Sequence, residues 1–199
     1  MTDLNASRTA LLVVHLQGDI VSSGTAFGAL FEPEVTARNV LSQCNTAMAA
    51  VRAAGGLVVP LRIAYAPDFS DLEPTLPLLQ MVASAGCLKE GTEGAAIVGA
   101  IDLAEDDVVV THKRPGPFTD SELEELLRSR GIENVVVCGV ATNASVEAAV
   151  RQASDLGFAT SVLSDASSAA DSASHEASLR SMGLFATVLS VADFTQNAT

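Results

Sequence analysis

Several features are missing from this sequence or scarce in it, and each absence narrows the class of protein. No apolar run approaches the roughly 18 residues that a helix needs to cross a bilayer. The polar start, residues 1–9, lacks the basic and apolar segments of a signal peptide. The three cysteines, Cys44, Cys87 and Cys138, are odd in number and form no CxxC pair. We therefore expect neither a disulfide framework nor a zinc knuckle, and a reducing cytoplasm as the compartment.

Positive charge is also scarce. The sequence has 11 lysines and arginines against 24 aspartates and glutamates, a net charge of −13. Such a surface repels phosphate backbones and anionic lipids, so neither nucleic acid nor membrane is an expected partner. The region of Gly24 and Gly28 lacks the GxGxxG pattern of dinucleotide-binding folds. No cofactor is expected.

Short apolar, β-branched runs alternate with helical stretches, which predicts an α/β fold. Strand–helix–strand repetition requires crossover connections, and these give a mainly parallel, Rossmann-like sheet with helices on both faces. At 199 residues the chain suits one domain, 1–199, with an ordered core at about 8–194. The expected strands are 10–15, 57–63, 107–111, 134–138, 158–163 and 186–189, and the expected helices are 33–54, 119–130, 143–156 and 174–182.

Reactive side chains in such a sheet gather at the carboxyl ends of the strands, where the strand order reverses. Three places qualify. They are His15 after the first strand, His112 and Lys113 after the third, and the turn 139–145 after the fourth. The long irregular segment 64–105 is expected to supply much of the pocket wall, because connections of that length are usually functional.

The same three places carry motifs that resemble those of the isochorismatase-like (cysteine hydrolase) superfamily. The first motif, typically LLVIDMQNDF, reads LLVVHLQGDI at 11–20. The second, a lysine before a short turn and a phenylalanine, reads THKRPGPF at 111–118. The third, typically GVATNVCVEST, reads GVATNASVEA at 139–148. Together the three motifs are specific, although each alone is weak.

The resemblance implies a six-stranded parallel sheet, a small-molecule substrate and a homo-oligomer, either dimer or tetramer. It also implies an Asp-Lys-Cys triad, in which cysteine attacks an amide carbonyl, aspartate takes its proton and lysine supports the charge. In the isochorismatase branch the cysteine is missing and the aspartate protonates a vinyl ether. A non-proline cis peptide is frequent in the third motif, and here it would be Val140–Ala141.

The chain departs from the family at all three triad positions. His15 stands at the aspartate position and Ser145 at the cysteine position. The lysine position is His112 when counted back from Phe118 without a gap, and Lys113 if the turn has lost one residue. Both candidates are kept.

The replacements are chemically consistent with one another. A serine hydroxyl needs a base to take its proton, and an imidazole suits that task better than a carboxylate. His15 acting on Ser145 would make a serine hydrolase, cleaving an amide, ester or vinyl ether bond, with backbone N–H groups near Ala144 available for an oxyanion. Two alternatives stay open: a catalytically silent ligand-binding protein, in which Ser145 caps a helix, and a non-hydrolytic isomerase or cyclase.

The matched motifs also supply candidate substrate-binding residues. Gln17 and Asp19 could line the pocket or hold its backbone, and Asp19 could also orient His15 or His112. Asn143 could cap the helix after the turn, with ligand contact as the alternative. The resemblance implies that a metal, where members bind one, is held by an aspartate and two histidines after the second strand. Residues 61–77 contain no histidine, so a metal site is not expected. His175 is expected to face solvent. The eight candidates for substrate binding are Gln17, Asp19, Arg114, Phe118, Val140, Ala141, Asn143 and Ala144.

Overall fold

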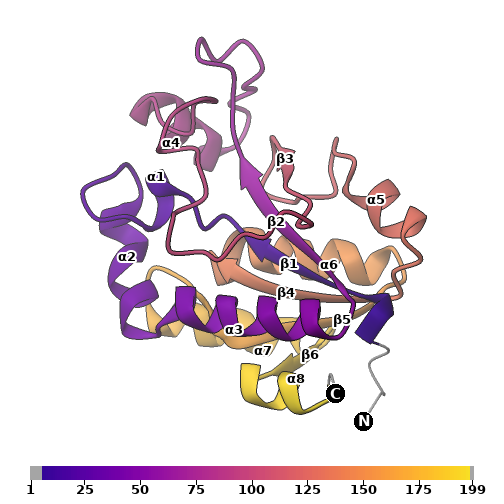
Figure 1. Cartoon of the computed structure of the whole chain (residues 1–199). Coiled ribbons are helices and arrows are strands. Elements are labelled where there is room, and N and C mark those ends of the chain that lie inside the picture. Colours follow the sequence, from indigo (N-terminus) through magenta and orange to yellow (C-terminus); the bar gives the residue numbers. More distant parts are fainter. Residues whose placement is uncertain (1–5, 198–199) are drawn as a thin grey trace.

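A parallel sheet forms the centre of the molecule (Figure 1). The computed structural model describes residues 6–197; the expected domain limits also take in residues 1–5 and 198–199, which lie outside the described residues. The strand order is β3-β2-β1-β4-β5-β6, and every neighbouring pair is parallel, which confirms the predicted α/β sheet. The strands are β1 (Thr9–Val14), β2 (Leu57–Ile63), β3 (Val110–His112), β4 (Asn134–Val140), β5 (Ala159–Ser168) and β6 (Thr187–Leu189).

Helices cover both faces of the sheet, because its central strands bury side chains in both directions. In β1, Leu11 and Val13 pack into one core cluster, and Leu12 and Val14 pack into the other. The first cluster includes α3 and α8, and the second includes α5, α6 and α7. The helices are η1 (Ala6–Arg8), α1 (Gly18–Val21), α2 (Gly28–Ala37), α3 (Val40–Ala53), α4 (Pro77–Ala85), α5 (Leu123–Ser129), η2 (Thr142–Val146), α6 (Glu147–Asp155), α7 (Ser172–Met182) and α8 (Val191–Asn197).

Several predicted bounds were wrong for local reasons. The expected helix 33–54 is two helices, since Asn39 between α2 and α3 has a left-handed φ of 54°. The expected helix 143–156 begins with the wider π-turn η2 before α6. The expected helix 119–130 begins only at Leu123, and the expected strand 107–111 pairs only from Val110. The expected strand 158–163 continues to Ser168, and α8 was not predicted.

The long segment between β2 and β3 contains α4 and folds back over the carboxyl end of the sheet (Figure 1). Two backbone hydrogen bonds fix its position. Val98 N–H donates to the Leu16 carbonyl and Tyr65 N–H donates to the Leu88 carbonyl, each at 2.9 Å. The strand order reverses at β1, which lies between β2 and β4. The segment therefore covers the edge at which the sheet is expected to bind a ligand.

Across residues 6–197, every helix is too short or too polar to cross a membrane.

Candidate active site

Two imidazoles meet at the carboxyl ends of β1 and β3. His15 directly follows β1 and has a left-handed φ of 52°, with its N–H donating to the Leu61 carbonyl at 3.0 Å. His112 is the last residue of β3. Their Nε2 atoms are 3.0 Å apart and their rings stack, with centroids 4.9 Å apart. Both side chains are buried. The two motif histidines therefore form one hydrogen-bonded pair.

The hydrogen bonds of this pair determine where its protons lie. His112 Nδ1 is 2.7 Å from the Arg114 carbonyl oxygen, and a carbonyl oxygen can only accept, so Nδ1 of His112 carries a proton. In the neutral ring Nε2 of His112 is then unprotonated, and it accepts the Nε2 proton of His15. His15 is thus left with an unprotonated Nδ1.

Burial keeps both rings neutral. Loss of hydration, reinforced by the neighbouring His112, holds the pKa of His15 well below the usual 6.5. Burial lowers the pKa of His112 to about 4, against the opposing effect of the Arg114 carbonyl. At neutral pH the pair therefore carries no charge, and each ring is a weaker base than a free imidazole.

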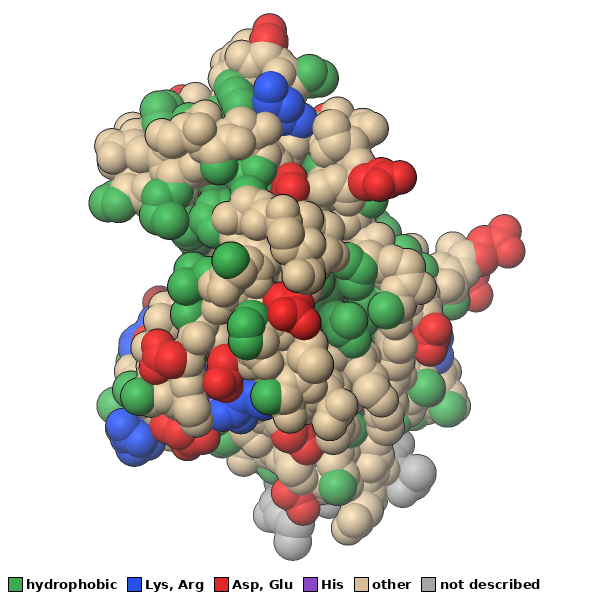
Figure 2. All heavy atoms as spheres, turned by 90° about the vertical axis from the view of Figure 1, so that its left-hand side faces the viewer, with side chains coloured by type: hydrophobic (Ala, Val, Ile, Leu, Met, Phe, Trp, Pro, Cys, Tyr) green, Lys and Arg blue, Asp and Glu red, His purple; other side chains and the backbone are tan. Residues whose placement is uncertain are grey.

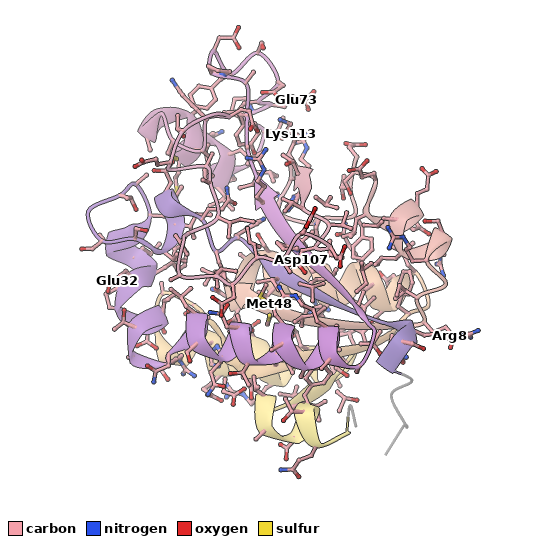
Figure 3. All side chains as sticks on the ribbon, viewed as in Figure 1. Arg8, Glu32, Met48, Glu73, Asp107 and Lys113 are labelled. Carbon is pink, nitrogen blue, oxygen red and sulfur yellow. The ribbon has the colours of Figure 1, made fainter. Side chains whose placement is uncertain are left out.

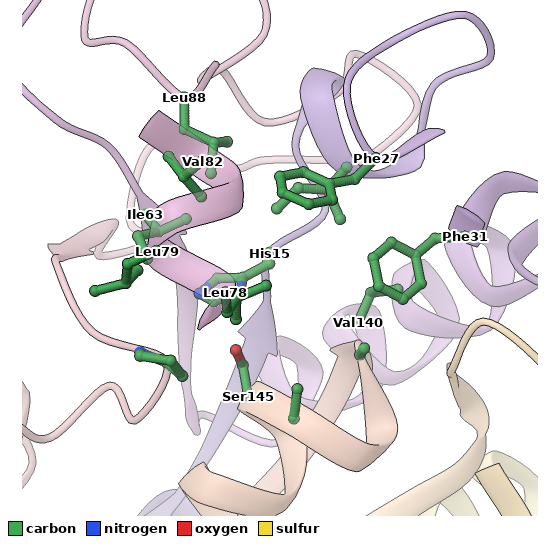
Figure 4. A pocket seen from close by; sticks show the side chains of 14 residues that line it. His15, Phe27, Phe31, Ile63, Leu78, Leu79, Val82, Leu88, Val140 and Ser145 are labelled. Atoms are coloured by element: carbon green, nitrogen blue, oxygen red, sulfur yellow. The ribbon is translucent and has the colours of Figure 1, made fainter. Parts of the chain in front are cut away.

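Ser145 and His15 line the same cavity. Ser145 lies in η2, the π-turn that follows β4, and its hydroxyl points to the side of the cavity where His15 lies (Figure 4). The preceding Val140–Ala141 peptide is cis, as predicted, and both residues line the cavity together with Ala144. The empty space between these residues is about 500 Å³ with the open mouth included, and the part that the centre of a water-sized sphere can reach is about 70 Å³.

Ser145 and His15 line the same cavity but are not hydrogen-bonded to each other in the described chain. Within residues 6–197, no hydrogen bond joins the Ser145 hydroxyl to His15 or His112. His15 gives its Nε2–H to His112 instead. Catalytic hydrogen bonds are often long in the absence of substrate, so the separation does not by itself remove His15 as a base.

His112, rather than Lys113, lies beside His15. The Lys113 ammonium turns away from the cavity, donates to the Ala64 carbonyl and pairs with Asp71 at 2.7 Å. Arg114 likewise pairs with Glu73, in the upper part of the molecule in Figure 3. The structure thus assigns the two lysine candidates different places: the His112 imidazole is hydrogen-bonded to His15, which lines the cavity, and the Lys113 cation is paired with Asp71.

Gln17 and Asp19, from the first motif, hold the backbone and do not line this cavity. The Gln17 amide donates to the carbonyls of Ile63 and Ala95 and accepts from the Ile63 N–H, with all three distances between 2.8 and 2.9 Å. The Asp19 carboxylate accepts the Leu88 N–H at 2.8 Å and contacts neither imidazole. Both residues therefore anchor the long segment over the sheet edge.

Phe118 and Asn143 also lie apart from the cavity lining, whereas Ala144 belongs to it. Phe118 packs in the second core cluster near Phe158, with ring centroids 6.4 Å apart. Asn143 is exposed, and its side chain makes no cap hydrogen bond. The Ala144 N–H already donates to the Ala141 carbonyl at 3.0 Å, so it is not available to an oxyanion in this conformation.

The prediction that His175 faces solvent was wrong. His175 belongs to α7, and its buried ring forms a hydrogen bond with the Thr142 hydroxyl at 2.8 Å. Ser178, one turn further along, donates to the Thr142 carbonyl at 3.0 Å. The third histidine thus supports the backbone of η2, on which Ser145 sits.

Segment 64–105 supplies much of the cavity wall, as predicted, but sequence reasoning did not name its lining residues and missed the wall formed by α1 and α2. Helices α2 and α4 contribute apolar side chains from opposite sides (Figure 4), and the closely spaced leucines after Pro77 were the available signal. Within the described chain, no group of three or more His, Cys, Asp and Glu side chains is placed to hold a metal ion. The lining residues outside the motifs are Ile20, Phe27, Phe31, Ile63, Leu78, Leu79, Val82, Leu88 and Pro115.

Comparison with known proteins matches this architecture. The parallel sheet with a cavity at the carboxyl ends of its strands places the protein in the class of Rossmann-like α/β domains. The Isochorismatase domain model matches residues 9–193. The chain belongs to the isochorismatase family. The isochorismatase family protein YecD of Escherichia coli O157:H7 is 33% identical over 180 residues, covering 90% of this chain and 89% of YecD.

One further relative and one solved structure are similar to the chain. The ureidoacrylate amidohydrolase RutB of Klebsiella pneumoniae is 31% identical over 172 residues, covering 80% of this chain and 72% of that protein. A cysteine hydrolase from Pseudomonas syringae has a TM-score of 0.88 over 100% of this chain and 95% of its own. At 23% identity, this second likeness shows the fold alone.

Proposed function

We propose that the protein hydrolyses an amide or ester bond of a small organic molecule, with Ser145 as nucleophile and His15 as general base. His112 is the positioning residue that fixes the proton on Nε2 of His15. In this proposal the reaction uses no cofactor, and the protein is a homo-oligomer of the cytoplasm.

The hydrogen bond from His112 Nδ1 to the Arg114 carbonyl is the observation that carries the proposal. It sets the tautomer of His112 and, through the Nε2–Nε2 contact, that of His15. The arrangement has the logic of a catalytic triad, in which a third group orients the base. Here the third group is a neutral imidazole held by a backbone carbonyl.

The reaction follows in two balanced steps. The Ser145 oxygen attacks the carbonyl carbon, and its proton passes to His15 Nδ1; the leaving group takes that proton as its bond to the carbonyl carbon breaks. A water molecule then attacks the acyl-serine and gives a proton to His15. The Ser145 oxygen departs and recovers that proton, which restores both groups.

Support also comes from the family and from the charge state of the pair. RutB is named an amidohydrolase, which favours cleavage of an acyl bond. Opening a vinyl ether requires an acid, and the lowered pKa of both imidazoles leaves neither protonated at neutral pH. Acyl transfer therefore fits the residues better than proton donation.

A second candidate is a catalytically silent ligand-binding protein. It is favoured by one observation: the Nε2–H of His15 is directed to His112, and the Ser145 hydroxyl has no imidazole partner among residues 6–197. A non-hydrolytic isomerase or cyclase would use the imidazoles without the serine.

Covalent labelling separates these candidates. The protein is treated with diethyl p-nitrophenyl phosphate, and the modified residue is located by peptide mass spectrometry. We expect release of nitrophenol with phosphorylation of Ser145, loss of labelling in Ser145→Ala, and full labelling in Ser23→Ala, which changes an exposed serine. Absence of an adduct on Ser145 in the folded wild-type protein would overturn the serine-nucleophile proposal.

A further inference from the structure

We propose that the cavity selects uncharged substrates with an apolar acyl group and rejects anionic ones. This inference rests on the proposed function for the identity of the reacting bond, but the selection itself is a property of the cavity wall.

The wall between helices α2 and α4 is hydrocarbon. Phe27 and Phe31 lie on one side and Leu78, Leu79 and Val82 on the other (Figure 4). Seen from the α2 side, the molecule is hollowed between its upper part and its body, with hydrophobic side chains around the hollow (Figure 2). An acyl group entering here exchanges water for carbon on both sides, which favours apolar groups in proportion to the area they bury.

The two cations that precede the lining residue Pro115 already form ion pairs with carboxylates. Lys113 pairs with Asp71, and Arg114 pairs with Glu73 and donates to the Thr75 hydroxyl at 3.2 Å. No lysine or arginine is among the cavity-lining residues of the described chain. A carboxylate on the substrate would therefore find no counter-charge in the cavity.

The penalty for an anion has two parts. Burying a charge without a partner costs hydration that nothing restores, so an ionised group binds much more weakly than its methyl counterpart. The net charge of −13 adds a repulsive field around the whole molecule. Both effects act in the same direction, against anionic substrates.

Binding of a matched pair of amides tests the selection without requiring turnover. Hexanamide and adipamate differ only in a terminal methyl against a terminal carboxylate. Their affinities are measured by ligand-observed NMR titration on the Ser145→Ala variant, which cannot form an acyl-enzyme. We expect hexanamide to bind at least about tenfold more tightly than adipamate. Equal affinity, or a preference for adipamate, would overturn the inference.

A charge introduced into the wall should reduce the preference. Leu78 lines the cavity and is 37% exposed, so Leu78→Arg can be accommodated while its guanidinium reaches the cavity. Met81 is on the same helix and 50% exposed but does not line the cavity, so Met81→Arg adds the same charge as a matched control. We expect Leu78→Arg to narrow the preference at least threefold relative to Met81→Arg. An identical response in both variants would mean that net charge, not the wall, sets selectivity and would contradict the inference.

The outcomes distinguish the two proposals. If the amides bind with the expected preference but Ser145 is never labelled, the selection stands and the serine mechanism fails. If Ser145 is labelled but adipamate binds as well as hexanamide, the mechanism stands and the selection fails.

Discussion

His112 and Lys113 are adjacent in sequence, yet they belong to two regions of opposite character. His112 points into a buried, uncharged pair with His15, whereas Lys113 points into an ionic layer that contains Asp71, Arg114 and Glu73. In this chain the proton-accepting imidazoles and the ion pairs therefore lie in different regions. Most members of the family are expected to hold an acid and a cation together at this position. Here two neutral rings form a pair of which His15 lines the cavity, and the cations pair with carboxylates of the loop above it.

The largest effect on activity is expected from removing the general base, His15. His15→Asn suits the left-handed φ of 52°, which asparagine tolerates, but takes away the imidazole. We expect kcat/KM for p-nitrophenyl butyrate to fall on the order of 10³-fold, because the serine loses its proton acceptor. Urea unfolding of the variant controls for loss of structure. Unchanged turnover in a folded variant would remove His15 from the mechanism.

The scaffold and the motif positions were predictable from sequence, but the directions of the side chains were not. Continuous apolar runs such as 10–14 give buried parallel strands, and the third motif gave the cis bond at Val140–Ala141. Sequence left His112 and Lys113 as equal candidates, because adjacent residues at a strand end point to opposite sides and only the fold decides which side faces the cavity.

Side chains that satisfy backbone groups were also hidden from sequence reasoning. Gln17 and Asp19 were predicted either to line the pocket and bind substrate or to hold its backbone, and only the fold shows that they hold Ile63, Ala95 and Leu88. Their partners lie 46 to 78 residues away, so no local pattern announces them. His175 escaped prediction for the same reason, since its partner Thr142 belongs to another element.

The second prediction concerns the proton held by the pair. His112→Gln can still accept from His15 Nε2 through its amide oxygen and donate to the Arg114 carbonyl, whereas His112→Leu can do neither. We expect roughly a 10-fold loss of kcat/KM for glutamine and roughly a 100-fold loss for leucine. Equal losses in the two variants, with both folded, would show that His112 does not act by positioning His15.

The third prediction uses the lowered pKa of His112. Its folded pKa of about 4 lies below the unfolded value of 6.5, so the unfolded chain binds more protons between these values. Stability is therefore retained above pH 6.5 and lost as pH falls toward 4. We expect the free energy of unfolding at pH 5 to lie on the order of 1–2 kcal/mol below that at pH 7.

The control for this pH dependence is the His112→Gln variant. Carboxylates with lowered pKa, such as Asp71 and Glu147, also destabilise the fold in acid, so the quantity to compare is the difference between the two proteins. Urea unfolding at pH 5 and pH 7 measures it. A variant as acid-sensitive as the wild type would show that the buried ring contributes nothing to this slope.

The smallest effect is expected from the ionic region. Lys113→Met keeps a long apolar stem beside the Tyr65 ring and removes the ammonium, which lies 5.5 Å from that ring's centroid. Its ion pair with Asp71 is 38% exposed on both sides, and such pairs contribute little to stability. We expect kcat/KM to change less than about threefold, and Asp71→Asn, which breaks the same pair from the other side, to match it. A loss of 100-fold in Lys113→Met but not in Asp71→Asn would mean that the ammonium itself acts on the substrate. Lys113 would then belong to the catalytic site and not to the ionic region.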